Sequence, residues 1–108
     1  MRILYLGDVM GRAGRRAVVE RLAGLRVDWR LDFVVVNGEN ATSGVGLSAA
    51  HAKTLFEAGA DCVTLGDHAF DQKDMLAHIG SDARIIRPLN FSKSAPGSGA
   101  RGFDVTGG

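Results

Sequence analysis

Carboxylate and amide side chains recur directly after apolar runs of this sequence, each time beside a glycine. These oxygen-bearing residues are Asp8, Glu39, Asn40 and Asp67. Hard oxygen donors suit Mg²⁺, Mn²⁺ or Fe²⁺ better than a metal that prefers thiolates. The neighbouring glycine lets the backbone turn sharply and lets an ion approach closely. The pattern therefore favours a metal site with oxygen ligands.

Such a ligand set matches one well-defined kind of chemistry. Two divalent cations about 3.5 to 4 Å apart that share carboxylates catalyse phosphate-ester hydrolysis, because they polarise the phosphoryl group and convert a bound water into a hydroxide nucleophile. A nearby histidine can protonate the departing alkoxide. His68 directly follows Asp67 and is the candidate for this proton donor. We therefore expect a metal-dependent phosphoesterase.

Each of these residues also has a purely structural interpretation. Asp8 suits a helix N-cap, and Asn40 suits a turn. Asp71 lies at the start of an expected helix and is interpreted as its cap rather than as a catalytic group. Glu39 is harder to explain in this way, because a carboxylate directly after three buried valines needs a partner. Together, the structural interpretations would have to account for ligand-type residues at the same end of three strands.

The candidate residues lie at the ends of elements that alternate between strand and helix. We expect strands at 2–7, 32–40, 61–66 and within 83–91, and helices at 12–25, 47–59 and 71–80. Apolar strands separated by helices predict parallel β-α-β units with both faces of the sheet covered. Ser48 is the expected N-cap of the second helix and Gly59 its C-terminal stop. Ligands of open α/β sheets bind beyond the carboxyl ends of the strands, so this arrangement gathers the candidates at one edge.

Composition and charge argue against several other classes of protein. The 108 residues are 45% hydrophobic and 23% charged, which is typical of a globular domain. A net charge of +1 gives no electrostatic argument for a nucleic-acid surface or a membrane surface. No apolar run approaches the roughly 20 residues of a membrane span, and we expect a cytoplasmic protein.

Several further side chains are interpreted as structural or solvent-exposed rather than as functional. The single cysteine, Cys62, lies in an apolar run and is expected to be a buried, inert thiol. His51 and His78 lie within expected helices and are interpreted as surface or core histidines. The arginines of the helix at 12–25 are interpreted as a solvated face. None of these residues is expected to belong to the metal site.

Four blocks of the sequence resemble one known family. They are "GDVMGRAGR" at 7–15, "NGENATSGVGL" at 37–47, "TLGDHAFD" at 64–71 and "IRPLNF" at 86–91. These blocks are similar to those of the YmdB-like bacterial metallophosphoesterases, which belong to the calcineurin-like phosphoesterase superfamily. The four blocks stand in the family's order and make the resemblance specific.

The resemblance implies a fold, an activity and a set of residue roles. The implied fold is a metallophosphoesterase-like α/β sandwich, and the implied activity is phosphodiester hydrolysis with 2′,3′-cyclic nucleotides as a substrate class. The implied cofactors are two divalent metal ions, iron or manganese, with magnesium possible. By position in the motifs, Asp8 resembles a ligand of one metal, Glu39 the carboxylate that bridges both, and Asn40 a further ligand. Asp67 resembles a ligand of the second metal, and His68 resembles the proton donor. A homo-oligomer is also implied.

The sequence departs from the family pattern in two respects. The family usually has asparagine at the place of Asp67. The family is also more than twice as long, and its second half carries a further histidine and a His-x-His pair that complete the metal shells. We therefore expect 1–91 to be the N-terminal part of a metallophosphoesterase domain in a truncated chain. The Gly- and Ser-rich residues 92–108 are expected to be a loop that leads to a further strand.

A second class of function stays open from the residues alone. The chain would then be a non-catalytic α/β module, or an inactive fragment, that binds a nucleotide or a partner through the same strand ends. Replacing His68 by alanine separates the two, because it removes hydrolysis only if the chain belongs to an enzyme.

Overall fold

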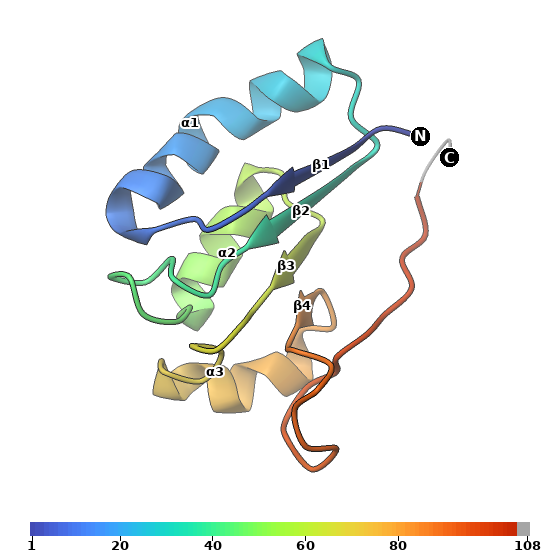
Figure 1. Ribbon diagram of the computed structural model, residues 1–108. Helices are drawn as coiled ribbons and strands as arrows, with labels where there is room; N and C mark the ends of the chain where they lie inside the picture. Colours follow the sequence, from blue (N-terminus) through green and yellow to red (C-terminus); the bar gives the residue numbers. More distant parts are fainter. Residues whose placement is uncertain (106–108) are drawn as a thin grey trace.

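The computed structural model describes residues 1–105 and contains a single parallel sheet (Figure 1). Its strands are β1 (Ile3–Leu6), β2 (Phe33–Asn37), β3 (Cys62–Thr64) and β4 (Ile85–Ile86). They lie in the order β1-β2-β3-β4, and each neighbouring pair is parallel. This arrangement confirms the α/β class predicted from the alternating pattern.

Helices carry the connections between the strands. They are α1 (Gly11–Asp28), α2 (Ala49–Ala58) and α3 (Lys73–His78), which continues into a short 3-10 helix, η1 (Ile79–Ser81). The side-chain oxygen of Ser48 accepts a hydrogen bond from the backbone N–H of His51 and so caps α2. Gly59 ends α2 with a φ of 126°, which favours glycine. Both expected caps of α2 are confirmed.

The hydrophobic core lies between the sheet and a layer of helices. Consecutive strands are neighbours and parallel crossovers are right-handed, so successive helices fall on the same side of the sheet. Val34 and Val36 of β2 face this layer and are fully buried, as are Leu22 of α1 and Leu55 of α2. Full burial of one such side chain contributes roughly 1.5 to 3 kcal/mol to stability.

The other face of the sheet is only partly covered, which corrects the expectation of a sheet covered on both sides. Ile3 and Tyr5 of β1 are 61% and 59% exposed. The C-terminal segment runs back toward the N-terminus (Figure 1), and the Phe103 ring meets the Phe33 ring edge-on with centroids 5.1 Å apart. The cause is the sequential strand order, which places the helices of residues 1–105 on the opposite face.

The segment after β4 is an irregular loop in the described part of the chain. Residues 101–105 do not form the further strand expected near the C-terminus, and 106–108 lie outside the described residues. Arg87 is buried and donates hydrogen bonds to the backbone carbonyls of Pro88 and Pro96. These bonds satisfy the buried guanidinium and fasten the loop beside β4.

Two expectations drawn from composition can be compared with the structure. Cys62 is buried, and burial raises the pKa of its thiol to about 11, with Asp61 acting in the same direction. The thiol is therefore protonated at neutral pH and unreactive, as expected. Within residues 1–105, none of the helices has the length and apolar character needed to cross a membrane.

Candidate metal centre

The four candidate ligands all lie at the carboxyl edge of the sheet. Asp8 follows β1, Glu39 and Asn40 follow β2, and Asp67 follows β3. The parallel register aligns the ends of these three strands, so their turns lie side by side. Because β2 is the middle strand of the three, its two ligands lie between the other two.

Asp8 has a backbone conformation that residues other than glycine seldom adopt. Its φ is 49°, and the left-handed region costs about 1 to 2 kcal/mol for an ordinary residue. Its carboxylate accepts a 2.9 Å hydrogen bond from the side-chain amide of Asn40. The N-cap position of α1 belongs to Met10, so the capping interpretation of Asp8 is wrong. Strain of this kind is concentrated at functional sites, and here it accompanies the pairing of two candidate ligands.

The carboxylate of Glu39 lies directly against Gly66 at the end of β3. A Cβ atom at position 66 would overlap both carboxylate oxygens, so only glycine leaves room for this side chain. The sequence pattern indicated that a glycine here permits close approach, and in the structure the group that approaches it is the Glu39 carboxylate. The contact brings Glu39 beside the turn that begins with Asp67.

The loop that follows the β2 ligands is held by side-chain hydrogen bonds. Thr42 Oγ1 accepts a hydrogen bond from the backbone N–H of Ser48 at 2.9 Å and is hydrogen-bonded to Nδ1 of His51 at 2.6 Å. The guanidinium of Arg15 on α1 donates to the carbonyl of Ala41 at 2.5 Å. Arg15 therefore differs from the solvated arginine that the sequence predicted. Its hydrogen bond connects α1 to the loop that follows Glu39 and Asn40.

Acid should weaken this loop through His51. Burial is the main cause that lowers the pKa of His51, Arg15 adds to it, and Asp74 opposes it. Folded His51 therefore binds fewer protons than the unfolded residue. The stability that this difference provides is complete above the unfolded pKa of about 6.5 and is lost as the pH falls through the folded pKa.

Replacing His51 by asparagine should remove this part of the pH dependence. The side-chain amide of asparagine can form a hydrogen bond with the Thr42 hydroxyl in place of Nδ1, but it does not titrate. Thermal unfolding of both proteins at about pH 7.5 and about pH 5.5 measures the effect. The parent protein should lose more stability on acidification than His51→Asn does. Equal losses would contradict the role of His51.

His68 and Asp71 form a close pair on the turn after β3. Nδ1 of His68 lies 2.6 Å from a carboxylate oxygen of Asp71. Gln72 occupies the N-cap position of α3, and no side chain caps that helix. The capping interpretation of Asp71 is therefore wrong. A sequence signal for the pair did exist, because the acid follows the histidine by three residues.

The donor chemistry fits part of a metal site. Asp8, Glu39, Asn40 and Asp67 offer three carboxylates and one amide, which are ligands for Mg²⁺, Mn²⁺ or Fe²⁺. The space beside Gly66 holds the Glu39 carboxylate, and any side chain at position 66 would collide with it. In the described part of the chain, however, no three His, Cys, Asp or Glu side chains are gathered closely enough to hold an ion. The contacts among the candidate residues are pairwise, and residues 1–105 do not form a complete site by themselves.

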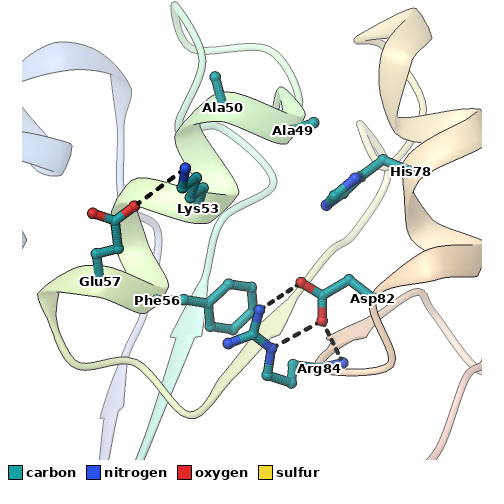
Figure 2. A pocket seen from close by; sticks show the side chains of 8 residues that line it. All are labelled: Ala49, Ala50, Lys53, Phe56, Glu57, His78, Asp82 and Arg84. Carbon is teal, nitrogen blue, oxygen red and sulfur yellow. Dashed lines mark hydrogen bonds and ion pairs between the residues drawn. The ribbon is translucent and has the colours of Figure 1, made fainter.

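The candidate ligands do not line the larger of two cavities in the described structure. A cavity of about 650 Å³ lies along α2 and α3 and contains none of the candidate ligands. Figure 2 shows Arg84 in this cavity between Phe56, whose ring centroid is 3.8 Å away, and Asp82, whose pKa is lowered mainly by the Arg84 hydrogen bond. A second cavity, of about 490 Å³ between β1 and α1, does include Asp8 in its wall.

The fold and the strand-end residues define an α/β protein with carboxylate and amide side chains at the carboxyl edge of a parallel sheet. This chain belongs to the YmdB-like family, because the family model for YmdB-like proteins matches residues 4–108. The match confirms the family expected from the four sequence blocks.

Named relatives and solved structures agree with this membership. The chain is 39% identical to the 2′,3′-cyclic-nucleotide 2′-phosphodiesterase of Bacillus subtilis, over 92% of this chain and 38% of that protein. It is 42% identical to a putative phosphatase/phosphodiesterase of Mycoplasma pneumoniae, over 87% and 34% of the two chains. A crystal structure of a hypothetical protein from Thermus thermophilus superposes with a TM-score of 0.91 at 43% identity, covering 99% and 41%. A novel phosphatase from Mycoplasma pneumoniae superposes with a TM-score of 0.84 at 40% identity, covering 93% and 37%. The chain thus spans 34% to 41% of these proteins.

Proposed function

We propose that this chain supplies the N-terminal part of the active site of a metal-dependent phosphodiesterase. Its substrates would be small phosphodiesters, with 2′,3′-cyclic nucleotides as the class. The observation that carries the proposal is the Glu39 carboxylate against Gly66. Glu39 follows β2, the strand between β1, which Asp8 follows, and β3, which Asp67 follows. Support for the substrate class comes from the name of the Bacillus subtilis relative.

In this proposal Asp8, Glu39, Asn40 and Asp67 hold two divalent ions, iron or manganese, with magnesium as a further candidate. When bound, the ions would supply Lewis-acid activation of the phosphoryl group and of a water molecule. Glu39 comes from the middle strand and would serve both ion positions. Four side chains are too few for two ions of near-octahedral coordination, so further ligands would come from outside this chain.

His68 is the proton donor in this proposal. Asp71 occupies Nδ1 of the ring, so Nε2 carries the proton that would pass to the leaving alkoxide oxygen. His68 follows Asp67 on one turn, which keeps the donor next to the proposed position of the second ion. The homo-oligomer and the cytoplasmic location remain predictions.

Hydrolysis of 2′,3′-cyclic AMP by the complete gene product tests the proposal. Turnover should require Mn²⁺ or Fe²⁺ and stop on chelation. His68→Ala should lower kcat by roughly 10²- to 10⁴-fold and should retain Mn²⁺ binding in a calorimetric titration. His78→Ala, a change in α3 outside the proposed site, serves as the matched control and should keep full turnover. Turnover that is indifferent to chelation and to His68→Ala would overturn the proposal.

The 108-residue chain alone provides a second arm of this test. It should bind Mn²⁺ more weakly than the complete gene product and should hydrolyse substrate at close to the background rate. Robust turnover by the chain alone would contradict the proposal that ligands are supplied from outside it.

A non-catalytic binding module is the second candidate function. It is favoured by one observation, which is that residues 1–105 hold no assembled group of three metal-ligating side chains. Such a module would bind a nucleotide at the strand ends without metal and would be indifferent to His68→Ala. Nucleotide titrations in the presence and absence of chelator separate it from the enzyme.

A further inference from the structure

The contact between His68 and Asp71 is a close one at the surface of the molecule. Nδ1 of the ring lies 2.6 Å from Oδ2 of the carboxylate, and the two side chains are 45% and 43% exposed. Exposed ion pairs contribute little to stability. The contact therefore matters for the orientation of the ring. It turns Nδ1 toward the Asp71 carboxylate and Nε2 away from it.

The backbone holds the two side chains on one compact turn. The N–H of Asp71 donates to the carbonyl of His68 at 3.2 Å, and the N–H of Ala69 donates to the carbonyl of Gly66 at 2.9 Å. Ala69 is fully buried and anchors the turn in the core. The imidazole and the carboxylate therefore start from backbone positions with little freedom.

The loop that follows Glu39 and Asn40 contacts the same turn. The side chain of Gln72 donates to the carbonyl of Val45 at 2.7 Å. Gly46 has a φ of 74°, and a Cβ there would come within 3.0 Å of the His68 carbonyl oxygen and 3.2 Å of the Asp71 Cβ. The loop that follows Glu39 and Asn40 thus packs directly on the His68–Asp71 turn.

We propose that Asp71 is a positioning residue that fixes the imidazole of His68 with a proton on Nδ1 and with Nε2 directed toward the leaving group. The inference rests on the proposed role of His68 as proton donor. The Asp71 carboxylate accepts from Nδ1–H before and after transfer. When the ester O–P bond breaks, the Nε2 proton goes to the departing oxygen, which leaves neutral His68 with its remaining proton on Nδ1. The proton is then replaced from solvent water.

Leaving groups of different basicity provide the kinetic test, in the complete gene product with Mn²⁺. Asp71→Asn is isosteric and removes the charge. It should lower kcat for 2′,3′-cyclic AMP, which releases a basic alkoxide, by roughly 10- to 100-fold with little change in KM. Bis(p-nitrophenyl) phosphate releases a phenolate that needs no proton, so its kcat should fall by less than about threefold. Asp74→Asn, the same change three residues further on, should leave both rates unchanged.

The tautomer of His68 provides a test that does not depend on activity. Long-range ¹H–¹⁵N spectra of the histidine-labelled, metal-free protein report which ring nitrogen carries the proton, and His68→Gln identifies the signal. The parent protein should have the neutral ring protonated on Nδ1, and Asp71→Ala should move the proton toward Nε2. A ring protonated on Nε2 in the parent protein would overturn the inference even if every variant failed to fold.

The two tests also separate this inference from the proposed function. Equal losses of kcat for both substrates in Asp71→Asn would mean a general structural role and would overturn the positioning role. If His68→Ala leaves alkoxide release unchanged, the proton-donor role itself fails, whatever the tautomer of the ring.

Discussion

Replacing Gly66 by alanine should abolish metal binding at the strand ends and reduce phosphodiester hydrolysis by the complete gene product by roughly 100-fold or more. The added Cβ would occupy the space that the Glu39 carboxylate now fills. Glu39 would have to move away from the end of β3, and its position beside Asp67 would be lost. Loss of a group that merely orients a ligand already costs about 10- to 100-fold in metal affinity or activity, so displacement of Glu39, a proposed ligand, should cost at least as much. Mn²⁺ titration followed by calorimetry measures the loss.

Gly24→Ala is the matched control for this prediction. Gly24 lies inside α1, and nothing comes within 4 Å of a Cβ built there. The change should stabilise the protein by about 0.5 to 1 kcal/mol, because alanine is a better helix former, and it should leave Mn²⁺ affinity unchanged. Circular dichroism establishes that both variants are folded. Wild-type Mn²⁺ affinity in a folded Gly66→Ala protein would refute the proposed place of Glu39.

The elements of the fold could be predicted because their signals are local. Three consecutive valines mark β2, and the apolar spacing of α1 places its buried residues on one stripe. Ser48 was predictable as a cap for the same reason, since its hydrogen bond reaches only three residues along the chain. The uncovered face of the sheet was not predictable in this way. A run of valines is compatible with burial on both faces, and only the order of the strands decides where the helices lie.

The capping interpretations of Asp8 and Asp71 are wrong for a common physical reason. Asp71 stands just before α3 in the sequence, but the compact turn that contains Ala69 delays the start of the helix to Lys73. Asp8 likewise precedes α1, but its left-handed φ turns the chain before the helix begins. Capping and pairing across a turn use the same residue types at nearly the same spacing. The choice between them depends on backbone turns that a single sequence does not specify.

The candidate ligands were predictable as residue types, and their contacts with one another were not. Asn40 meets Asp8 across 32 positions of the chain, which depends on the register of β1 and β2. The Glu39 contact with Gly66 depends in the same way on the pairing of β2 with β3. A sequence pattern that marks the ends of strands therefore predicts which edge carries the site, and the sheet register decides which side chains touch.

Glu39→Gln should be the most damaging substitution among the four candidate ligands. Glutamine keeps the size of the side chain and one carbonyl oxygen, so the contact with Gly66 can persist, but the negative charge is lost. A carboxylate from the middle strand is the ligand proposed to serve both ions, so its neutralisation should weaken both positions together. We expect Mn²⁺ affinity and turnover of the complete gene product to fall by roughly 100-fold or more, with little change in thermal stability without metal.

Glu57→Gln makes the same chemical change on α2, where the carboxylate is exposed and lies 3.9 Å from Lys53. Such an exposed pair contributes about 0 to 1 kcal/mol, so this control should leave both stability and Mn²⁺ affinity nearly unchanged. If Asp8→Asn removes one ion and Glu39→Gln removes both, as counted by calorimetric stoichiometry, the middle-strand carboxylate is the shared ligand. If each variant removes a single ion, Glu39 serves one position, and a residue outside this chain must join the two.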